Sequence, residues 1–233
     1  MSGTTVGERA ARAASLGHRS RATGEARQEL DALVRSDPDA RVRAVALGAR
    51  VRSGPRREAA VVWRSAAVDA DATVRRRAAE LAPALGAAAP TQPLLLLLAD
   101  DEPLVAEAAA FALGEHPRIG SRAITALGLA AATHGDPLVR EAAVAALGAR
   151  GDASTREIVV AACDDKPAVR RRAVLALAAF DGPEVEARLR LALTDRDWQV
   201  RQAAEDLLGV NESEGNAEPG SDVTFSRARR NEP

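Results

Sequence analysis

The stretch GDPLVREAAVAALGARGD, residues 135–152, contains the start, the body and the end of one amphipathic helix. Asp136 can accept hydrogen bonds from the first free backbone N–H groups, and Pro137 fits the next position because an N–H there would have no partner. The spacing predicts a helix of about three turns that ends at Gly148, where glycine adopts a left-handed cap at little cost. Its apolar stripe occupies positions i, i+4, i+7 and i+8, which are Val139, Ala143, Ala146 and Leu147.

The same pattern occurs six times along the chain. In every copy an anchor valine is followed four residues later by an alanine, and successive anchors are 30 to 34 residues apart. Self-similarity at this period predicts a solenoid, in which each unit buries its apolar face only against its neighbours. A methyl-sized side chain at a fixed slot indicates helices that approach closely. The anchors are Val42, Val74, Val105, Val139, Val169 and Val200.

A second set of apolar segments separates these helices. Two examples are EARQELDALVRS, residues 25–36, and TREIVVAACDD, residues 155–165. Each segment is long enough for two or three helical turns, and each ends before an acidic turn. Because no stretch shows sustained alternation with period two, we expect no sheet. The sequence therefore predicts an all-α fold, a right-handed α-α superhelix of about six helix pairs over residues 24–209.

The copies resemble HEAT repeats, and specifically the short bacterial repeats related to phycobilin lyase subunits. The residues that carry the resemblance are turns of the form Asp-x-x-Val-Arg, followed by alanine and leucine at helical spacing. The resemblance implies a HEAT-like solenoid, but it implies little about function because one solenoid fold serves many roles. The turns lie at residues 39–43, 71–75, 136–140 and 197–201.

Arginine follows the anchor valine in five of the six copies. An arginine that recurs once per repeat beside an acidic turn predicts a ladder of Asp–Arg contacts between adjacent repeats. On this interpretation Arg140 in the opening stretch has a structural role. The predicted members of the ladder are Asp39, Arg43, Asp71, Arg75, Asp136, Arg140, Asp197 and Arg201.

The composition limits location and function. Over 233 residues, 46% hydrophobic and 28% charged, the chain can build one continuous core. The net charge of -1 argues against a generic nucleic-acid binder, for which a strongly basic domain is expected. The longest apolar run is too short to span a bilayer and no secretory segment is present, so we expect a cytoplasmic protein. The single cysteine, Cys163, excludes an internal disulfide and is expected to be buried.

The two ends differ from the middle. Residues 1–23 are basic, and we expect a flexible leader with one helical turn. Residues 210–233 are polar and interrupted by glycine and proline, and we expect a disordered tail. Within this tail Val223 and Phe225 precede a cluster of arginines. This is either a short motif that folds onto a partner or onto the acidic third repeat, or a tail without function.

Known catalytic patterns are missing. Deoxyhypusine hydroxylases are similar HEAT-like proteins that hold two irons with His-Glu pairs at the starts of second helices. The matching slots here hold Glu141-Ala142 and Glu107-Ala108, so the pairs are absent. HEAT-like DNA glycosylases hold a damaged nucleotide among aromatic groups, which Trp63, expected in the core, and the distant Trp198 do not provide. Phycobilin lyase activity has no support either, and we expect no metal or cofactor.

Two arginine triplets exceed the predicted ladder. At 100° per residue about two arginines of each triplet point the same way, and second helices usually line the concave face of HEAT-like arrays. The triplets form either a solvated face of mixed charge or a patterned surface for one complementary partner. Trp198 either covers the end of the hydrophobic array or is an exposed aromatic anchor. The triplets are Arg75, Arg76, Arg77 and Arg170, Arg171, Arg172.

The sequence favours a non-catalytic protein–protein interaction scaffold, expected to be a monomer with an unidentified protein partner and no membrane. One alternative is a degenerate HEAT-like enzyme or accessory subunit, similar to deoxyhypusine hydroxylase or to bilin lyases. Another alternative is a weak nucleic-acid binder that uses the arginine clusters.

Overall fold

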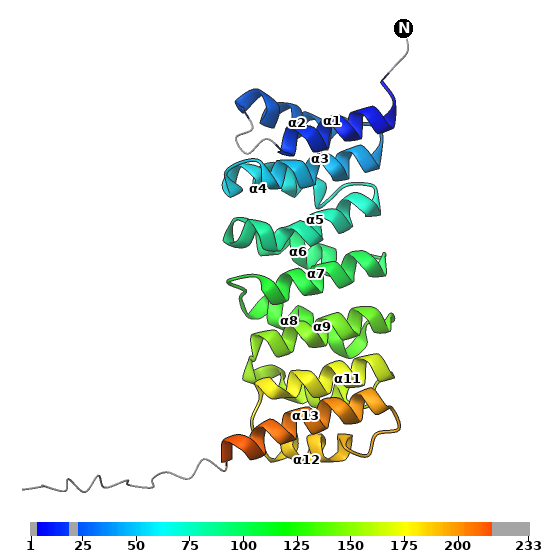
Figure 1. The fold of residues 1–233 in the computed structure, drawn as a ribbon, viewed down its shortest axis with the longest axis vertical. Helices are drawn as coiled ribbons and strands as arrows, with labels where there is room; N and C mark the ends of the chain where they lie inside the picture. Colours follow the sequence, from blue (N-terminus) through cyan, green and yellow to red (C-terminus); the bar gives the residue numbers. More distant parts are fainter. Residues whose placement is uncertain (1–3, 19–22, 216–233) are drawn as a thin grey trace, which may run out of the picture.

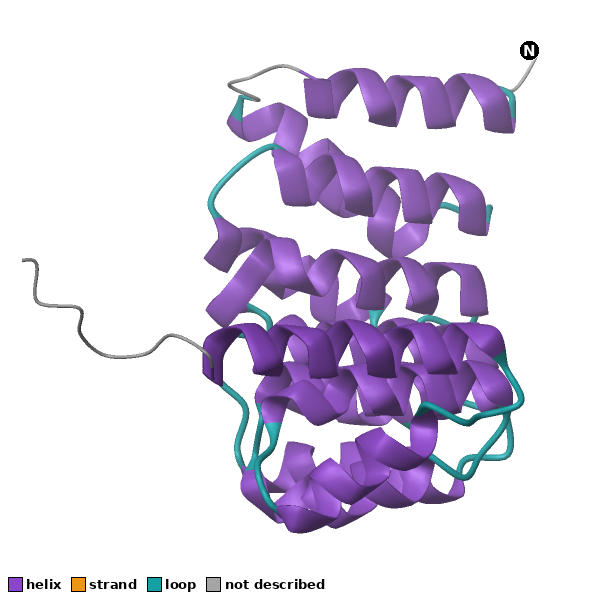
Figure 2. Cartoon of the chain, turned by 60° about the horizontal axis from the view of Figure 1, so that its bottom comes forward, coloured by secondary structure: helices purple, strands orange, loops and turns teal. Residues whose placement is uncertain are grey.

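The computed structural model describes residues 4–18 and 23–215, with side chains described up to residue 209. This part of the chain contains thirteen α-helices, three short 3-10 helices and no strand. The helices stack in chain order as an α-α superhelix, with α1 at one end and α12 and α13 at the other (Figure 1). Only helices and the loops between them are drawn for the described residues in Figure 2. The predicted all-α fold and its six helix pairs, α2–α3 to α12–α13, are thereby confirmed.

The helices form two layers. The second helix of each pair packs against the second helices before and after it, so this layer is continuous along the stack. The second-helix layer consists of α1 (Val6–His18), α3 (Ala40–Arg52), α5 (Ala72–Leu85), α7 (Pro103–Glu115), α9 (Pro137–Arg150), α11 (Pro167–Ala176) and α13 (Trp198–Gly215). The first-helix layer consists of α2 (Gly24–Ser36), α4 (Arg56–Ala66), α6 (Thr91–Leu98), α8 (Ser121–Thr133), α10 (Arg156–Ala162) and α12 (Pro183–Ala192). The 3-10 helices η1 (Gly86–Ala88), η2 (Ala153–Thr155) and η3 (Leu177–Ala179) follow α5, α9 and α11.

The acidic turns start the second helices. The side chains of Asp39, Asp71 and Asp136 each accept a hydrogen bond, at 2.8 Å, from the backbone N–H two residues further on. Asp197 accepts the equivalent bond from Gln199 at 2.9 Å. These bonds satisfy backbone donors that have no partner inside the helix. Four of the six predicted starts are therefore set by aspartate caps, whereas α7 and α11 begin after Glu102 and Lys166, whose side chains make no capping bond.

The interior is built from small aliphatic residues. All six anchor valines are at most 1% exposed, and the six alanines four residues later are fully buried. Trp63 is also fully buried, as predicted, and its indole nitrogen donates to the carbonyl of Ala78 at 2.7 Å. Cys163 is buried, and burial raises the pKa of its thiol to about 11, so the thiol stays neutral.

Gly148 lies inside α9 and does not end it, which corrects the predicted helix boundary. The helix continues to Arg150, and Gly151 at φ 59° is the left-handed cap. A Cβ at Gly148 would lie 2.6 Å from the Cβ of Ala176 on α11. Only a residue without a Cβ permits this approach of two helix backbones. The same close approach occurs between Gly17 and Ala49, and between Gly114 and Ala146.

Residues 6–18 form α1, where the sequence suggested a flexible leader. The helix packs on α3, and its Ala13 is fully buried. Arg9 stands eight residues before Gly17, as Arg140 stands eight residues before Gly148. By this spacing α1 is the second helix of a partial repeat that precedes the six predicted pairs.

The last helix also passes the predicted boundary at residue 209. It continues to Gly215. The apolar tail residues Val223 and Phe225 lie outside the described residues. In the part of the chain that the structure describes, no helix combines the length and the apolarity needed to cross a bilayer.

Replacing Gly148 by alanine should destabilise the protein, although alanine favours a helix over glycine by about 1 kcal/mol. The added methyl would have to displace α11, because Ala176 leaves it no room. We expect a net loss of about 1–3 kcal/mol in the free energy of unfolding, measured by urea denaturation. Gly7→Ala in α1 is the matched control, since a Cβ there meets no atom within 4 Å. Equal effects of the two substitutions would contradict the close contact.

Candidate functional site

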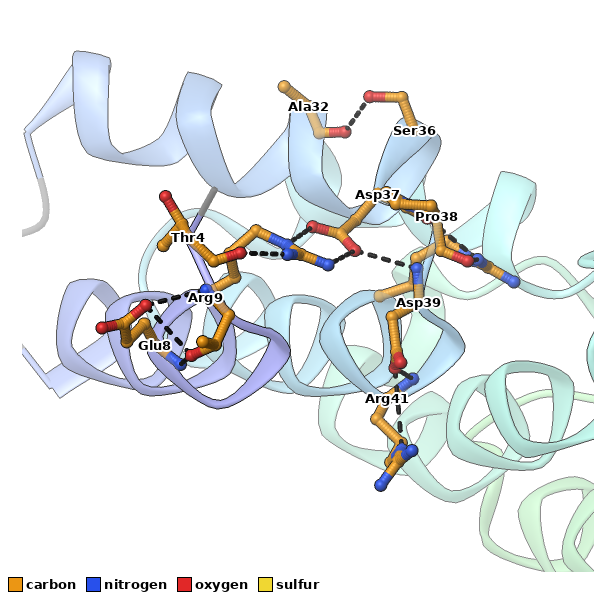
Figure 3. Close-up of polar contacts among 11 residues, drawn as sticks. Thr4, Glu8, Arg9, Ala32, Ser36, Asp37, Pro38, Asp39 and Arg41 are labelled. Atoms are coloured by element: carbon orange, nitrogen blue, oxygen red, sulfur yellow. Dashed lines mark hydrogen bonds and ion pairs between the residues drawn. The ribbon is translucent and has the colours of Figure 1, made fainter. Parts of the chain in front are cut away.

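Five arginines of the second-helix layer each pair with an aspartate of the next inter-helix turn. In each pair Nε and Nη2 donate to the two carboxylate oxygens over 2.6 to 3.2 Å. Such bidentate pairs are among the stronger polar contacts in proteins. We call each pair a rung, and Figure 3 shows the first one, between Arg9 and Asp37. The others are Arg43–Asp69, Arg75–Asp100, Arg140–Asp165 and Arg170–Asp195.

The third nitrogen of the guanidinium binds the turn of its own repeat. Nη1 of Arg43 donates to the carbonyl of Asp37 at 2.9 Å, and Nη1 of Arg140 donates to the carbonyl of His134 at 2.7 Å. One side chain therefore joins two successive turns, and the rungs fix the register of neighbouring repeats.

The acidic members of the rungs are not the residues that the sequence analysis named. Asp39, Asp71, Asp136 and Asp197 cap their own helices, and the arginines bind other carboxylates. The reason is geometric, since the free edge of each guanidinium faces the following turn and not its own. Arg201 donates to the carbonyl of Asp195 at 2.7 Å and has no carboxylate partner among the described residues.

One rung is missing between α7 and α9. Ala106 occupies the arginine slot, and His134 occupies the aspartate slot. Nδ1 of His134 accepts a hydrogen bond from the N–H of Asp136 at 3.1 Å, as Asp69 accepts one from Asp71 at 2.9 Å. This turn therefore keeps its local hydrogen bond and lacks only the contact between repeats.

Four of the rungs change the acidity of their carboxylates. The hydrogen bond from the arginine lowers the pKa of the aspartate below its ordinary value, and burial opposes this shift with a smaller effect. In these four rungs the charged form of the aspartate is therefore favoured in the folded protein. The aspartates concerned are Asp37, Asp100, Asp165 and Asp195.

Acid should weaken the fold through these groups. Because the folded pKa lies below the unfolded one, the stabilisation is complete above about pH 4 and is lost as the pH falls through the folded values. We expect the free energy of unfolding, measured by urea denaturation, to fall steeply only below about pH 4. Asp195→Asn removes one rung and should make this decline shallower. Stability that does not change down to about pH 2 would count against the assignment.

Installing the missing rung should stabilise the protein. Ala106→Arg with His134→Asp recreates the pair that the other repeats use. Since the existing rungs are partly exposed, we expect a coupling free energy of about 0.5–1 kcal/mol in a double-mutant cycle. Each single variant lacks its partner and should be neutral or destabilising. A coupling near zero would show that α7 and α9 do not share the geometry of the other pairs.

Neither predicted arginine triplet is a bare positive surface, because every arginine in them has a carboxylate partner. Arg75 and Arg170 belong to rungs. The face is therefore one of mixed charge. The remaining pairs are Arg76 and Arg77 with Glu80, at 3.0 and 2.9 Å, and Arg171 and Arg172 with Glu141, at 3.9 and 3.5 Å.

Trp198 is the first residue of α13 and is 64% exposed. A side chain so exposed does not cover the core at the end of the array, which was the first of the two predicted roles. Its exposed indole remains available as an aromatic anchor.

The exposed face of the second-helix layer carries an apolar strip that the sequence analysis missed. Two hollows form it, one of about 230 Å³ between α7 and α9 and one of about 320 Å³ between α9 and α11. The two hollows share the alanine surface of α9 and the side chain of Arg172. Phe111 is 56% exposed and Leu175 is 41% exposed. We define the apolar strip as Phe111, Leu138, Ala142, Ala145, Ala149 and Leu175.

Acidic residues border the strip. Glu107 and Glu115 lie about one helical turn before and after Phe111 and line the same hollow. Glu141 is approached by two arginines, whereas no ion pair joins Glu107 or Glu115 to another described residue. An exposed aromatic ring between two such carboxylates suits a ligand that is apolar and positively charged. In the sequence, the sign of this strip is a phenylalanine that stands six residues after the anchor valine of its repeat.

The described residues offer no obvious metal centre. Within residues 4–18 and 23–209, no three His, Cys, Asp or Glu side chains gather to hold a metal ion. Glu107 on α7 and Glu141 and Ala142 on α9 line the first hollow without forming such a cluster.

Comparison with known proteins bears on the fold. A family profile for HEAT repeats matches residues 91–168 and 155–210, which together make up just over half of the chain. Similar solved structures include the Escherichia coli protein YibA, 21% identical, covering 89% of this chain and 78% of that chain with a TM-score of 0.68. A designed armadillo repeat protein in complex with the peptide (KR)4 is 16% identical. The match covers 85% of this chain and 97% of that chain, with a TM-score of 0.51. Human deoxyhypusine hydroxylase is 21% identical. The match covers 90% of this chain and 81% of that chain, with a TM-score of 0.44. The search of curated proteins gave no match.

Proposed function

Because this chain belongs to the HEAT repeat family, we propose that it is a non-catalytic scaffold that binds a protein partner through its second-helix layer. The observation that carries the proposal is the apolar strip, where Phe111 and Leu175 are exposed, and where a rung between α9 and α11 holds the half of the surface that carries Leu175. A preformed surface loses little conformational entropy when it binds. Exposed aromatic residues in hollows commonly supply much of the binding energy at interfaces.

The border of the strip suggests the chemistry of the partner. A segment that places an apolar side chain against Phe111 and basic side chains against Glu107 and Glu115 would match the surface. The apolar contact would supply affinity, and the charges would set orientation and the rate of association. Arg172 on the opposite side would disfavour a second cation there.

We further propose a monomer in the cytoplasm, with repeats of the short bacterial type related to phycobilin lyase subunits. No specific observation favours the alternative functions. The arginine triplets that a nucleic acid would use are paired with carboxylates. The slots that would hold iron in a hydroxylase contain Glu141 and Ala142.

The test compares two equally simple surface variants. Phe111→Asp places a charge in the first hollow and should abolish capture of partner proteins from a lysate of the native host. Leu129→Asp is the matched control, because Leu129 is 64% exposed but lies on α8 of the other layer. Both variants should keep the helical circular dichroism spectrum. A set of captured proteins that is the same for both variants would refute binding at the strip.

The acidic border is tested separately. Glu107→Gln with Glu115→Gln keeps the shape of the hollow and removes both charges. We expect weaker capture that depends less on salt, because screening acts on charge pairs and not on apolar contacts. Capture with unchanged salt dependence would leave the carboxylates without a role.

A further inference from the structure

Helices α12 and α13 form the end of the stack opposite α1 (Figure 1). Residues of this last repeat line an apolar groove. Its volume is about 910 Å³. Leu208, eight residues after its anchor valine, lines the groove and is only partly buried. The same slot in earlier repeats is fully buried, as at Leu113 and Leu147. The groove is therefore a core position that no described residue covers. Its apolar lining includes Leu177, Phe180, Val185, Leu189, Leu193 and Leu207.

In three of the earlier repeats the connection after the second helix contributes a buried residue. Ala89 follows η1 and is 1% exposed, Thr155 ends η2 and is 2% exposed, and Phe180 follows η3 and is 9% exposed. The corresponding connection after α13 begins beyond Gly215. A continuation that follows the course of the earlier connections reaches this groove.

The sequence of that continuation has the matching chemistry. Val223 and Phe225 are the large apolar residues of residues 216–233. They stand two positions apart and so share one side of an extended segment. The groove presents an exposed carboxylate at Asp181, whereas the charge of Glu186 is balanced by Arg190 at 3.0 Å. Positive side chains follow the two apolar residues at Arg227, Arg229 and Arg230.

We propose that residues 223–230 dock in this groove and cap the array. Val223 and Phe225 cover Leu208 and the apolar lining, and the arginines face Asp181. The segment replaces the next repeat that a solenoid needs to shield its last apolar surface. This inference does not depend on the proposed function of the second-helix layer.

The reach of the chain permits this docking. The helix from Leu208 to Gly215 is about 10 Å long at 1.5 Å per residue. The ten residues from Gly215 to Phe225 span up to about 33 Å when extended, enough to fold back. A tethered segment also acts at an effective concentration of about millimolar, which favours it over a free ligand. A second copy of the chain, stacked symmetrically, would bring another Asp181 carboxylate to this groove and, from the described lining, no unpaired positive group to pair with it.

The experiment measures amide hydrogen exchange of α12 in the full chain. Val223→Asp with Phe225→Asp should expose the groove and speed exchange of the α12 amides by roughly tenfold or more. Thr224→Asp is the matched control, because it adds a charge to the same segment on the side that faces away from the groove. It should exchange like the unmodified chain.

Two results would overturn the proposal. One is α12 exchange that is the same in the double variant and in the unmodified chain. The other is protection of α12 that disappears when the unmodified chain is diluted, together with a dimer in light scattering, which would assign the groove to a second copy. Exchange of α3, far from the groove, serves as the internal reference for global stability.

Discussion

Where Gly148 of α9 meets Ala176 of α11, the two helices lie too close for a Cβ on the first of them. The fully buried alanines four residues after each anchor valine apply the same requirement along the stack. Close helices bring the arginine of one repeat within reach of the turn of the next, and the bidentate rungs become possible. Small residues in the second-helix layer thus determine both the apolar packing and the polar contacts that fix its register. An interior rich in alanine and almost without aromatic residues is the result.

The rungs also decide which charges remain for binding. Arginines are numerous in the sequence, but those such as Arg75 and Arg170 bind aspartates of the next turn and hold repeats together. Most of the positive charge in the second-helix layer is thereby neutralised within the fold. The surface features left over are apolar and acidic, at Phe111 and its flanking glutamates. The arginine triplets, although prominent in the sequence, are paired with carboxylates.

The repeat period and the anchor valines were enough to predict the helix pairs, because apolar spacing reports directly on which face is buried. Contacts between repeats were harder to predict. Arg43 stands close in sequence to Asp39, yet it binds Asp69, which a single repeat does not reveal.

Helix α1 was missed because its anchor slot holds a polar residue, although Arg9 has the ladder spacing. Arg50 occupies a leucine slot and is nevertheless buried, because Asp31 accepts its Nε–H at 2.8 Å.

The missing rung lies beside the first hollow of the apolar strip. In a solenoid the stability is close to a sum of terms between neighbouring repeats, so the α7–α9 interface lacks one term that the others have. Both partners, Ala106 and His134, depart from the pattern together, and this matters because a lone arginine or aspartate would leave a partly buried charge without a partner. The interface is instead held by apolar contact, with Gly114 against Ala146, and by Arg150, whose Nη1 donates to the carbonyls of Gly114 and His116 at 3.3 and 2.7 Å. The hollow at Phe111 therefore lies over an interface that has no rung, while the rungs on either side, Arg75–Asp100 and Arg140–Asp165, fix the register of the flanking repeats.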